Sequence, residues 1–543
     1  MSLVVDRRSL IRAGAFGLGA LALPGGRAAV AQIAAARGFT HAVASGEPGA
    51  DSMLLWARFV GAGADARVQA EIAETPDFRR VVAGGDTITG PWRDWTAKVT
   101  VDGLQPARSY FYRFVADGHV SPIGRTRTLP DGRVQRFRTA VFSCSNLPFG
   151  WFNAYGHTAA RGDVDLGIHL GDYLYEYRQG EYPSAKDAVA ARLLEPQGEL
   201  LHLADYRLRY ACYRADPDLQ ALHARLPFLI QWDDHETAND SWEGGAEHHD
   251  ASKGNWADRR AAAVQAWREW MPVSDTPWAR YDIGDLASLY RTESRLLARS
   301  HQLALEPVFQ DADPAAALVR FRDGAWRDPA RTMFGSDQEH WLASNMADSV
   351  RAGRRWQVVG SGTVLGDLQT PPGVADWLPP GAPLSIRARV QASLAAAKAG
   401  LPFNLDSWGG YPAARARLLT SAQHAGADLV VISGDSHNAW AFDLKQDGRA
   451  AGVEFAGHAV TSPGYESYFP TVPSADVVRA LVSANPELRW ANTADRGYMT
   501  VELSPEGATA EWLFVDTIRD RRPTAARTHR MRTATGRKQL LAV

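Results

Sequence analysis

Two hydrophobic patterns follow one another along the chain. Between residues 39 and 130, short apolar segments alternate with turn signals such as Asp102-Gly103 and Asp117-Gly118. Evenly spaced strands separated by turns are typical of an all-β sandwich. We therefore predict a small immunoglobulin- or fibronectin-like sandwich over residues 39–130. Its expected strands are residues 53–59, 67–73, 95–101 and 109–116.

The second pattern begins at residue 137. Apolar runs of strand length now alternate with longer helical stretches, which indicates a layered α/β domain with sheets flanked by helices. The expected helices are residues 200–216, 257–271 and 336–352. This domain is predicted to span residues 137–516, and residues 517–543 form an arginine-rich C-terminal tail.

The first 31 residues have the pattern of an export signal. Arg7 and Arg8 precede an apolar run at 13–23, and the small residues Ala29-Val30-Ala31 stand before Gln32. The run is too short for a confident transmembrane helix, and the small-residue stretch fits a cleavage site. The paired arginines resemble a twin-arginine signal, so we expect a periplasmic or secreted mature chain that uses the twin-arginine export machinery and has no transmembrane span. The alternative is a basic cap before a buried helix.

Composition excludes several classes of protein. The chain has 543 residues, 45% of them hydrophobic, which is enough for large packed cores and argues against disorder. Fifty-nine basic residues balance 61 acidic ones, so no global basicity indicates a nucleic acid or a membrane surface as partner. The two cysteines, Cys144 and Cys212, are too few for a disulfide framework, although a single disulfide between them remains an alternative.

Unusual polar residues follow four of the predicted strands of the second domain. These strands are residues 138–143, 165–170, 226–232 and 429–433. The residues that follow them are Cys144, Asp172 with Tyr175, Asp234 with His235, and Asp435 with His437. Because ligands of open α/β sheets bind outside the carboxyl ends of the strands, we expect these side chains to converge.

So many carboxylates would repel one another unless cations neutralise them, which favours a site for several metals. Asp172 could bridge two ions, as carboxylates do in two-metal hydrolytic sites. A thiolate and a phenolate suit iron(III), whereas oxygen ligands suit a hard divalent ion. Singly, Gly171-Asp172 could be a helix cap, His235 a core histidine and Cys144 a small buried residue. We interpret His248-His249 as an exposed loop pair.

These motifs resemble the PhoD-type alkaline phosphatase branch of the calcineurin-like metallophosphoesterase superfamily. The motifs are Ser143-Cys144-Ser145, Gly171-Asp172-Tyr173-Leu174-Tyr175, Trp232-Asp233-Asp234-His235-Glu236 and Gly434-Asp435-Ser436-His437. Cys144 stands where the superfamily has Asp-x-His, Asp234 where it has asparagine, and Asp435 where it has a first histidine. These departures are similar to the branch's own pattern. The segments 39–48 and 327–342 also resemble the family.

The resemblance implies a metallophosphoesterase domain with iron(III) on Cys144, Asp172, Tyr175 and His437. It implies Ca2+ on Asp172, Asp234 and Asp435, and a second Ca2+ near Asn239 or Asp240. His235, Asp234 and Asn239 are the expected catalytic residues. No histidine in this sequence matches the one that other members supply from the penultimate strand, here residues 356–361. With Cys144 an iron ligand and Cys212 in a helical stretch, we expect no disulfide.

The expected function is hydrolysis of phosphate mono- and diesters by a metal-bound hydroxide, with His235 protonating the leaving group. A phospholipase D-like phosphodiesterase on the same site is the alternative within this class. An extracellular binding protein with a degenerate metal site is the alternative outside it. The arginine-rich tail could supply a guanidinium to the bound phosphate, or it could be solvated and disordered.

Overall fold

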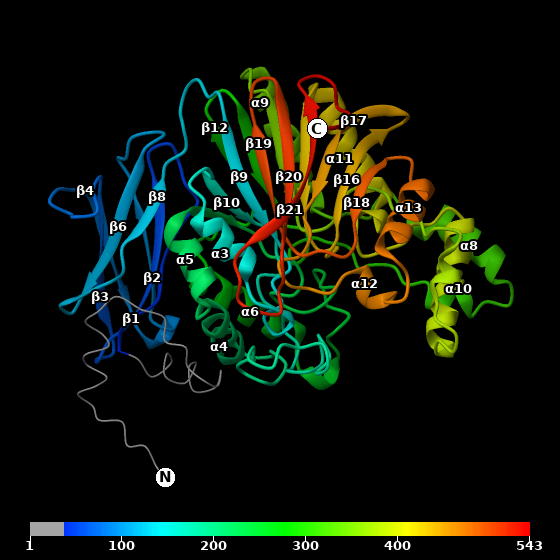
Figure 1. Cartoon of the computed structure of the whole chain (residues 1–543), viewed down its shortest axis with the longest axis horizontal. Coiled ribbons are helices and arrows are strands. Elements are labelled where there is room, and N and C mark those ends of the chain that lie inside the picture. The colour runs from blue at the N-terminus through cyan, green and yellow to red at the C-terminus, as the bar shows by residue number, and fades with distance from the viewer. Residues whose placement is uncertain (1–36) are drawn as a thin grey trace, which may run out of the picture.

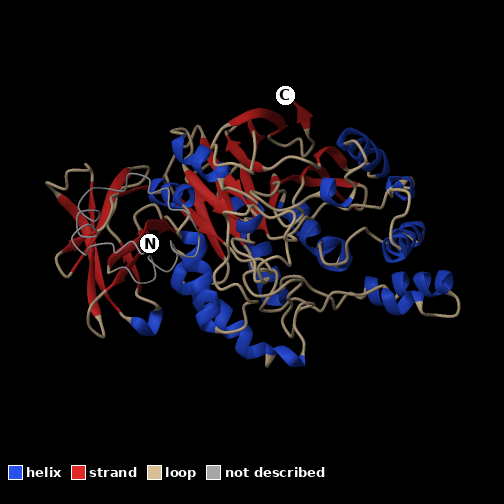
Figure 2. Cartoon of the chain, turned by 60° about the horizontal axis from the view of Figure 1, so that its bottom comes forward, coloured by secondary structure: helices blue, strands red, loops and turns tan. Residues whose placement is uncertain are grey.

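The computed structural model describes residues 37–543, and the predicted export signal lies outside them. Strands form the interior and helices lie around them (Figure 2). Among the helices of residues 37–543, none combines the length and apolar character needed to cross a bilayer. The N-terminal strands lie at one end of the molecule and helices α8 and α10 at the other (Figure 1).

The first sheet has ten strands and runs through most of the molecule. Its central strands β9, β10, β11 and β1 pair in parallel, and the strands on either side pair antiparallel. In spatial order it contains β22 (Leu541–Ala542), β21 (Ala525–Ala534), β20 (Gly507–Val515), β19 (Gly497–Leu503), β9 (Phe137–Phe142), β10 (Leu166–His169), β11 (Pro227–Ile230), β1 (Gly38–Gly46), β2 (Met53–Val60) and β5 (Thr96–Val101).

The second sheet has seven strands, of which β13, β14, β15 and β17 pair in parallel. Its spatial order is β12 (Ala279–Ile283), β13 (Ala287–Arg291), β14 (Trp356–Ser361), β15 (Leu429–Ser433), β17 (Arg449–Ala456), β16 (Ala439–Gln446) and β18 (Leu488–Asn492). Buried side chains of both sheets, such as Val141 and Ile168 from the first and Val358 and Val430 from the second, form one hydrophobic cluster. The two sheets therefore pack face to face.

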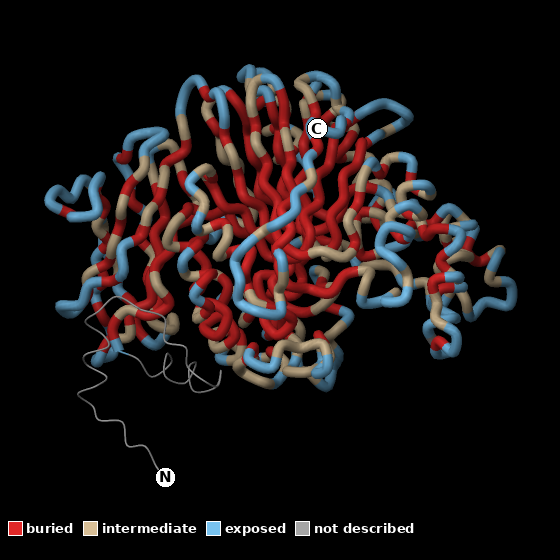
Figure 3. The backbone as a smooth tube through the Cα atoms, in the orientation of Figure 1, coloured by how far each residue is buried: buried red, intermediate tan, exposed pale blue. Residues whose placement is uncertain are grey.

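Helices cover the outer faces of this pair of sheets, which makes four layers. On the first sheet lie α3 (Asn153–Ala160), α4 (Leu203–Arg214), α5 (Pro217–Arg225) and α6 (Trp256–Trp270). On the second lie α9 (Gly335–Arg351), α11 (Pro412–Ala425) and α13 (Ser474–Ala484). The remaining helices are α7 (Glu306–Phe309), α8 (Pro314–Asp323), α10 (Leu384–Lys398) and α12 (Tyr465–Tyr468). The centre of all four layers is buried, and exposed segments lie at the periphery (Figure 3).

The N-terminal strands form a sandwich, but one of its faces belongs to the first sheet. Strands β1, β2 and β5 pack through a hydrophobic cluster against a five-stranded third sheet. That sheet contains β4 (Val81–Thr89), β3 (Ala66–Ala73), β6 (Ser109–Ala116), β7 (His119–Val120) and β8 (Gly124–Arg127). The four strands expected here are present as β2, β3, β5 and β6. Because β1 pairs in parallel with β11, the sandwich continues directly into the large sheet.

The arginine-rich C-terminal segment is not a disordered tail. Residues 525–534 form β21, which pairs along its length with β20, and β22 pairs with β21. Met531 of β21 is buried in the cluster between the two large sheets. Arginines of the segment form ion pairs with acids of the folded domain, Arg521 with Asp218 and Arg530 with Glu511. The expected boundary at residue 516 therefore cuts through the first sheet.

Candidate metal centre

Four strand ends from the two large sheets meet at one buried place. β9 leads to Cys144, β10 to Asp172 and β11 to Asp234, while β15 of the second sheet leads to Asp435. Cys144, Asp172 and Asp234 are buried, and Asp435 is partly buried. The convergence expected from the sequence is thus formed by parallel strands of two sheets rather than of one.

The first group of side chains contains the predicted iron ligands. Sulfur, oxygen and nitrogen atoms of Cys144, Asp172 and His437 lie within 4.8 Å of one another. The Tyr175 hydroxyl lies 3.2 Å from Asp172 Oδ2 and 3.3 Å from His437 Nε2. His437 Nδ1 is 2.7 Å from the Pro463 carbonyl, to which it donates, so Nε2 keeps its lone pair for a ligand. Burial lowers the pKa of His437 to about 3, which favours the neutral ring.

Two further groups share Asp172 with the first. Asp172, Asp234 and His235 form one, and Asp172, Asp233 and Asp435 form the other, each with ligand atoms within 4.8 Å. Asp172 is the common member of all three, which is the position expected of a bridging carboxylate. Asp233 is a member that the sequence did not assign to the metals.

The charges of these groups need compensation. Burial, together with the Asp172 carboxylate, raises the pKa of the Cys144 thiol and the Tyr175 phenol. Burial and the nearby Asp233 raise the pKa of Asp435 to about 7. The buried Oδ1 atom of Asp172 has no hydrogen-bond partner. These raised pKa values favour the protonated groups unless cations compensate the charges, because a buried charge is costly unless it is paired or coordinates a metal. The unpartnered oxygen of Asp172 fits such a cation.

The backbone at the site adopts conformations that side-chain-bearing residues rarely take. Cys144, Asp172, Asp435 and His437 all have positive φ, between 54° and 64°. Such strain persists where surrounding structure fixes it, and it concentrates at functional sites. Gly171 has a φ of 116° and also allows its loop to lie close to Asp233, since a Cβ at this position would lie 2.4 Å from Asp233 Cβ. The four candidate ligand residues are therefore held in place by their loops.

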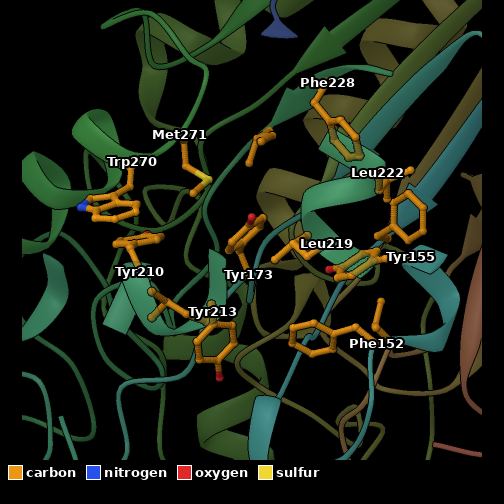
Figure 4. Close-up of a cluster of buried hydrophobic side chains, with 14 of the residues drawn as sticks. Phe152, Tyr155, Tyr173, Tyr210, Tyr213, Leu219, Leu222, Phe228, Trp270 and Met271 are labelled. Carbon is orange, nitrogen blue, oxygen red and sulfur yellow. The ribbon is translucent and has the colours of Figure 1, made fainter. Parts of the chain in front are cut away.

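The loop after β10 is anchored in the core. Tyr173 is buried among the rings and aliphatic side chains beneath the first sheet (Figure 4). Leu174 is buried in the same hydrophobic cluster. The Tyr173 hydroxyl lies 2.9 Å from His223 Nε2. Both oxygens of Glu236 accept backbone N–H groups of this loop, from Asp172 at 3.1 Å and from Tyr173 at 2.6 Å. Glu236 of the third motif thus positions the second motif.

His235 lies beside the metal groups with an acidic partner of its own. Its Nδ1 is 2.8 Å from Glu176 Oε2, and its ring centre is 4.2 Å from that of Tyr175. Burial would lower the pKa of His235, but Asp234 and Glu176 raise it well above its usual value. His248 also approaches Glu176, at 3.5 Å, so it belongs to this network and is not simply exposed.

Asn239 and Asp240 form hydrogen bonds with acidic residues around the candidate metal centre. The Asn239 backbone N–H donates to Glu176 Oε1 at 2.8 Å, and its side-chain amide donates to Glu247 at 2.8 Å. The Asp240 backbone N–H donates to Asp234 Oδ2 at 2.7 Å. Within residues 37–543, the three ligand groups do not include Asp240. These two residues shape the loop around Asp234 and Glu176.

Sequence reasoning missed Arg295. Its guanidinium is fully buried and forms two hydrogen bonds with Asp233, at 2.7 and 2.9 Å, and two with Asp406, at 2.9 and 2.8 Å. The adjacent acids Asp233 and Asp234 indicated that a cationic partner was needed. Nothing in the sequence could point to Arg295, because it stands in an irregular segment far from both acids.

The loop after β14 supplies a hydroxyl group that contacts the candidate metal centre. Thr363 follows this strand, and its Oγ1 donates to Asp435 Oδ2 at 2.8 Å.

Cys212, in α4, is a free and buried residue whose sulfur lies 3.5 Å from the Leu193 carbonyl, and Cys144 is free as well. Of the two cysteines, only Cys144 therefore belongs to the candidate metal centre.

Together, the fold and the site define a two-sheet α/β protein with a candidate metal centre at its strand ends. The family model for PhoD-like phosphatase matches residues 139–512, and the model for its N-terminal domain matches residues 26–130. The chain is 31% identical over 499 residues to alkaline phosphatase D of Bacillus subtilis (strain 168), covering 87% of this chain and 77% of that protein. A solved structure of PhoD shares 28% identity and a TM-score of 0.76, with 94% of this chain and 92% of that chain covered.

The chain belongs to the PhoD-like phosphatase family. It is accordingly a phosphoric ester hydrolase of the alkaline phosphatase type.

Proposed function

We propose that this chain is an exported, metal-dependent phosphoesterase that hydrolyses phosphate mono- and diesters. The observation that carries the proposal is the position of Asp172, which belongs to all three groups of ligand atoms. A carboxylate shared in this way is suited to bridge two cations that act on one phosphate.

We assign iron(III) to Cys144, Asp172, Tyr175 and His437, because a thiolate and a phenolate are strongly donating anions. We assign Ca2+ to Asp172, Asp234 and Asp435, because a hard cation prefers oxygen ligands. A second Ca2+ would lie near Asn239 or Asp240. When bound, these ions would neutralise the phosphate oxygens and lower the pKa of a water, which supplies the attacking hydroxide.

His235 is assigned to the leaving group. Its Nδ1 is held by Glu176, which leaves Nε2 free to donate a proton. The carboxylates of Asp234 and Glu176 raise the pKa of His235, which favours the protonated ring. Protonation of the departing oxygen by this group would release the alcohol as its bond to phosphorus breaks. Because the nucleophile would be hydroxide rather than a side chain, no covalent phosphoenzyme would form.

The test is chelation followed by reloading, with three substrates in parallel: a phosphomonoester, a phosphodiester and phosphatidylcholine. We expect hydrolysis of the first two to disappear on chelation and to return with iron and Ca2+. Undiminished hydrolysis after complete removal of metal would contradict the proposal. Preference for phosphatidylcholine over both other esters would favour the phospholipase D-like alternative.

Export is proposed from Arg7, Arg8 and the small residues before Gln32. Fusion of residues 1–31 to a reporter should carry it out of the cytoplasm, and Arg7→Lys with Arg8→Lys should keep it inside. Export of the double variant at the normal rate would contradict the use of the twin-arginine machinery.

A further inference from the structure

A cavity of about 470 Å3 opens directly beside the candidate metal centre. Residues 435–438, which include the ligands Asp435 and His437, line one end of it. The rest is lined mainly by α10, by the segment from Pro463 to Phe469 and by the loop that carries Phe403. The cavity therefore joins the metal centre to the part of the molecule where α10 lies.

Aromatic rings form one wall of this cavity. The rings of Phe403 and Tyr465 stack with their centres 6.0 Å apart, and those of Tyr465 and Phe469 stack at 6.2 Å. Trp440 meets Tyr465 edge to face at 6.1 Å, and Trp377 meets Phe469 in the same way at 5.1 Å. Trp440 and Trp377 belong to the core of the second sheet. Their contacts therefore hold the rings of Tyr465 and Phe469 against that core.

Aliphatic side chains add to the lining. Leu368, Val374 and Val390 line the cavity and also pack in or against that core cluster. Ile386 of α10 lines it too, although 40% of this residue is exposed. Phe403 is 46% exposed, so the aromatic wall extends to the surface. The lining is mostly apolar, although it also includes polar residues such as Arg389 and Asn404. Water leaves the apolar part of such a lining when an apolar group enters, which favours binding of that group.

The chemistry of the occupant follows from the two ends of the cavity. The metal centre takes the phosphate, whereas the cavity offers aromatic faces and aliphatic side chains to whatever the phosphate carries. Aromatic rings pack well in offset or edge-to-face contact with other rings. A ring-bearing alcohol esterified to phosphate would satisfy both ends at once.

We propose that this cavity, the aromatic pocket, binds an aromatic ring carried by the alcohol part of the phosphate ester. The proposal deepens the assignment as a phosphoesterase and rests on it. Phosphate esters of ring-bearing alcohols are therefore the preferred substrate class, ahead of esters of small polar or short aliphatic alcohols.

The test compares three monoesters on the metal-loaded protein: ethyl, 2-phenylethyl and octyl phosphate. The three are alkyl esters of primary alcohols, so differences in leaving-group chemistry are small. We expect kcat/KM for 2-phenylethyl phosphate to exceed that for ethyl phosphate at least about tenfold, the effect of burying one phenyl ring. It should also exceed that for octyl phosphate.

Two variants locate the effect in the aromatic pocket. Phe403→Ala removes a half-exposed wall ring, and Ser393→Trp fills the cavity from α10. Both should bring the ratio of kcat/KM for 2-phenylethyl phosphate to kcat/KM for ethyl phosphate towards one. Leu384→Ala is the matched control, because Leu384 is on the same helix and exposed but is not part of the lining.

The outcomes separate this proposal from the assignment on which it rests. Equal kcat/KM for ethyl and 2-phenylethyl phosphate would overturn the aromatic pocket and leave the phosphoesterase intact. Faster hydrolysis of octyl phosphate would overturn the choice of a ring over an aliphatic chain. If both pocket variants kept the wild-type ratio of kcat/KM for 2-phenylethyl and ethyl phosphate, the preference for the ring would come from another part of the molecule, and the aromatic pocket would be overturned. Failure to hydrolyse any phosphate ester would instead overturn the phosphoesterase assignment itself.

Discussion

Asp172 is the side chain shared by all three groups of candidate ligands. It is buried, has positive φ and an unpartnered oxygen, and lies in each ligand group. Asp172→Asn removes the negative charge and one of the two oxygen donors, without changing the size of the side chain. We expect a loss of kcat/KM greater than about 100-fold, together with reduced metal content, because even residues outside the ligand sphere cost 10- to 100-fold. Asp311→Asn, on the exposed surface, should change neither, and normal metal content in Asp172→Asn would contradict its bridging role.

His235 makes a separate prediction about the leaving group. His235→Ala should lower the turnover of esters with poor leaving groups by about 10^2- to 10^4-fold, the usual contribution of a positioned acid. Esters of acidic phenols should lose much less, because their oxygen leaves without a proton. His249→Ala provides a matched histidine control outside the Glu176 pair. Near wild-type turnover of a poor-leaving-group ester by His235→Ala would show that another group has this role.

Arg295 is predicted to stabilise the folded protein. Arg295→Met leaves Asp233 buried without its arginine and removes one of the two arginines that pair with Asp406, the other being Arg299. Breaking a buried pair in this way costs about 3–5 kcal/mol of unfolding free energy. Arg320→Met breaks an exposed pair with Asp311 and should cost less than about 1 kcal/mol. Chemical denaturation of both variants measures the difference. Equal stability of the two would mean that the Asp233 carboxylate has another partner.

At the scale of whole elements, β21 is the clearest departure from the sequence-based prediction. Its arginine-rich sequence predicts a C-terminal tail, yet β21 pairs in the first sheet and Met531 is buried between the large sheets. Met531→Ala should lower the free energy of unfolding by about 2–5 kcal/mol, whereas Arg532→Ala, its exposed neighbour, should change it by less than about 0.5 kcal/mol. Thermal denaturation distinguishes them, and equal effects would mean that β21 is not docked in solution.

Local pattern predicted individual elements well and pairings poorly. The strands before Cys144, Asp172, Asp234 and Asp435 are present, because apolar runs and turn residues act within a few positions. The pairing of β1 with β11, the split of the four strand ends between two sheets and the ion pair of Arg295 join segments far apart in sequence. Such contacts depend on the folded whole, and no periodicity encodes them.

For the whole molecule, the two stacked sheets explain why one buried centre can collect a thiol, a phenol, an imidazole and several acids. Each sheet delivers strand ends to the same place, and the outer helices keep that place buried. The aromatic pocket adds a second surface from the elements beyond the second sheet, so catalysis and selection of the ester are built from different parts of the chain.

The central claim is that Cys144 and Tyr175 are ligands of iron(III), and one measurement tests it most directly. The visible spectrum of the purified protein, recorded with its elemental analysis, should show iron, calcium and a tyrosinate-to-iron charge-transfer band. The band should vanish in Tyr175→Phe and persist in Tyr177→Phe, which has its ring near His235 but is not assigned as a ligand. An active, colourless protein that contains zinc and no iron would contradict both ligand assignments.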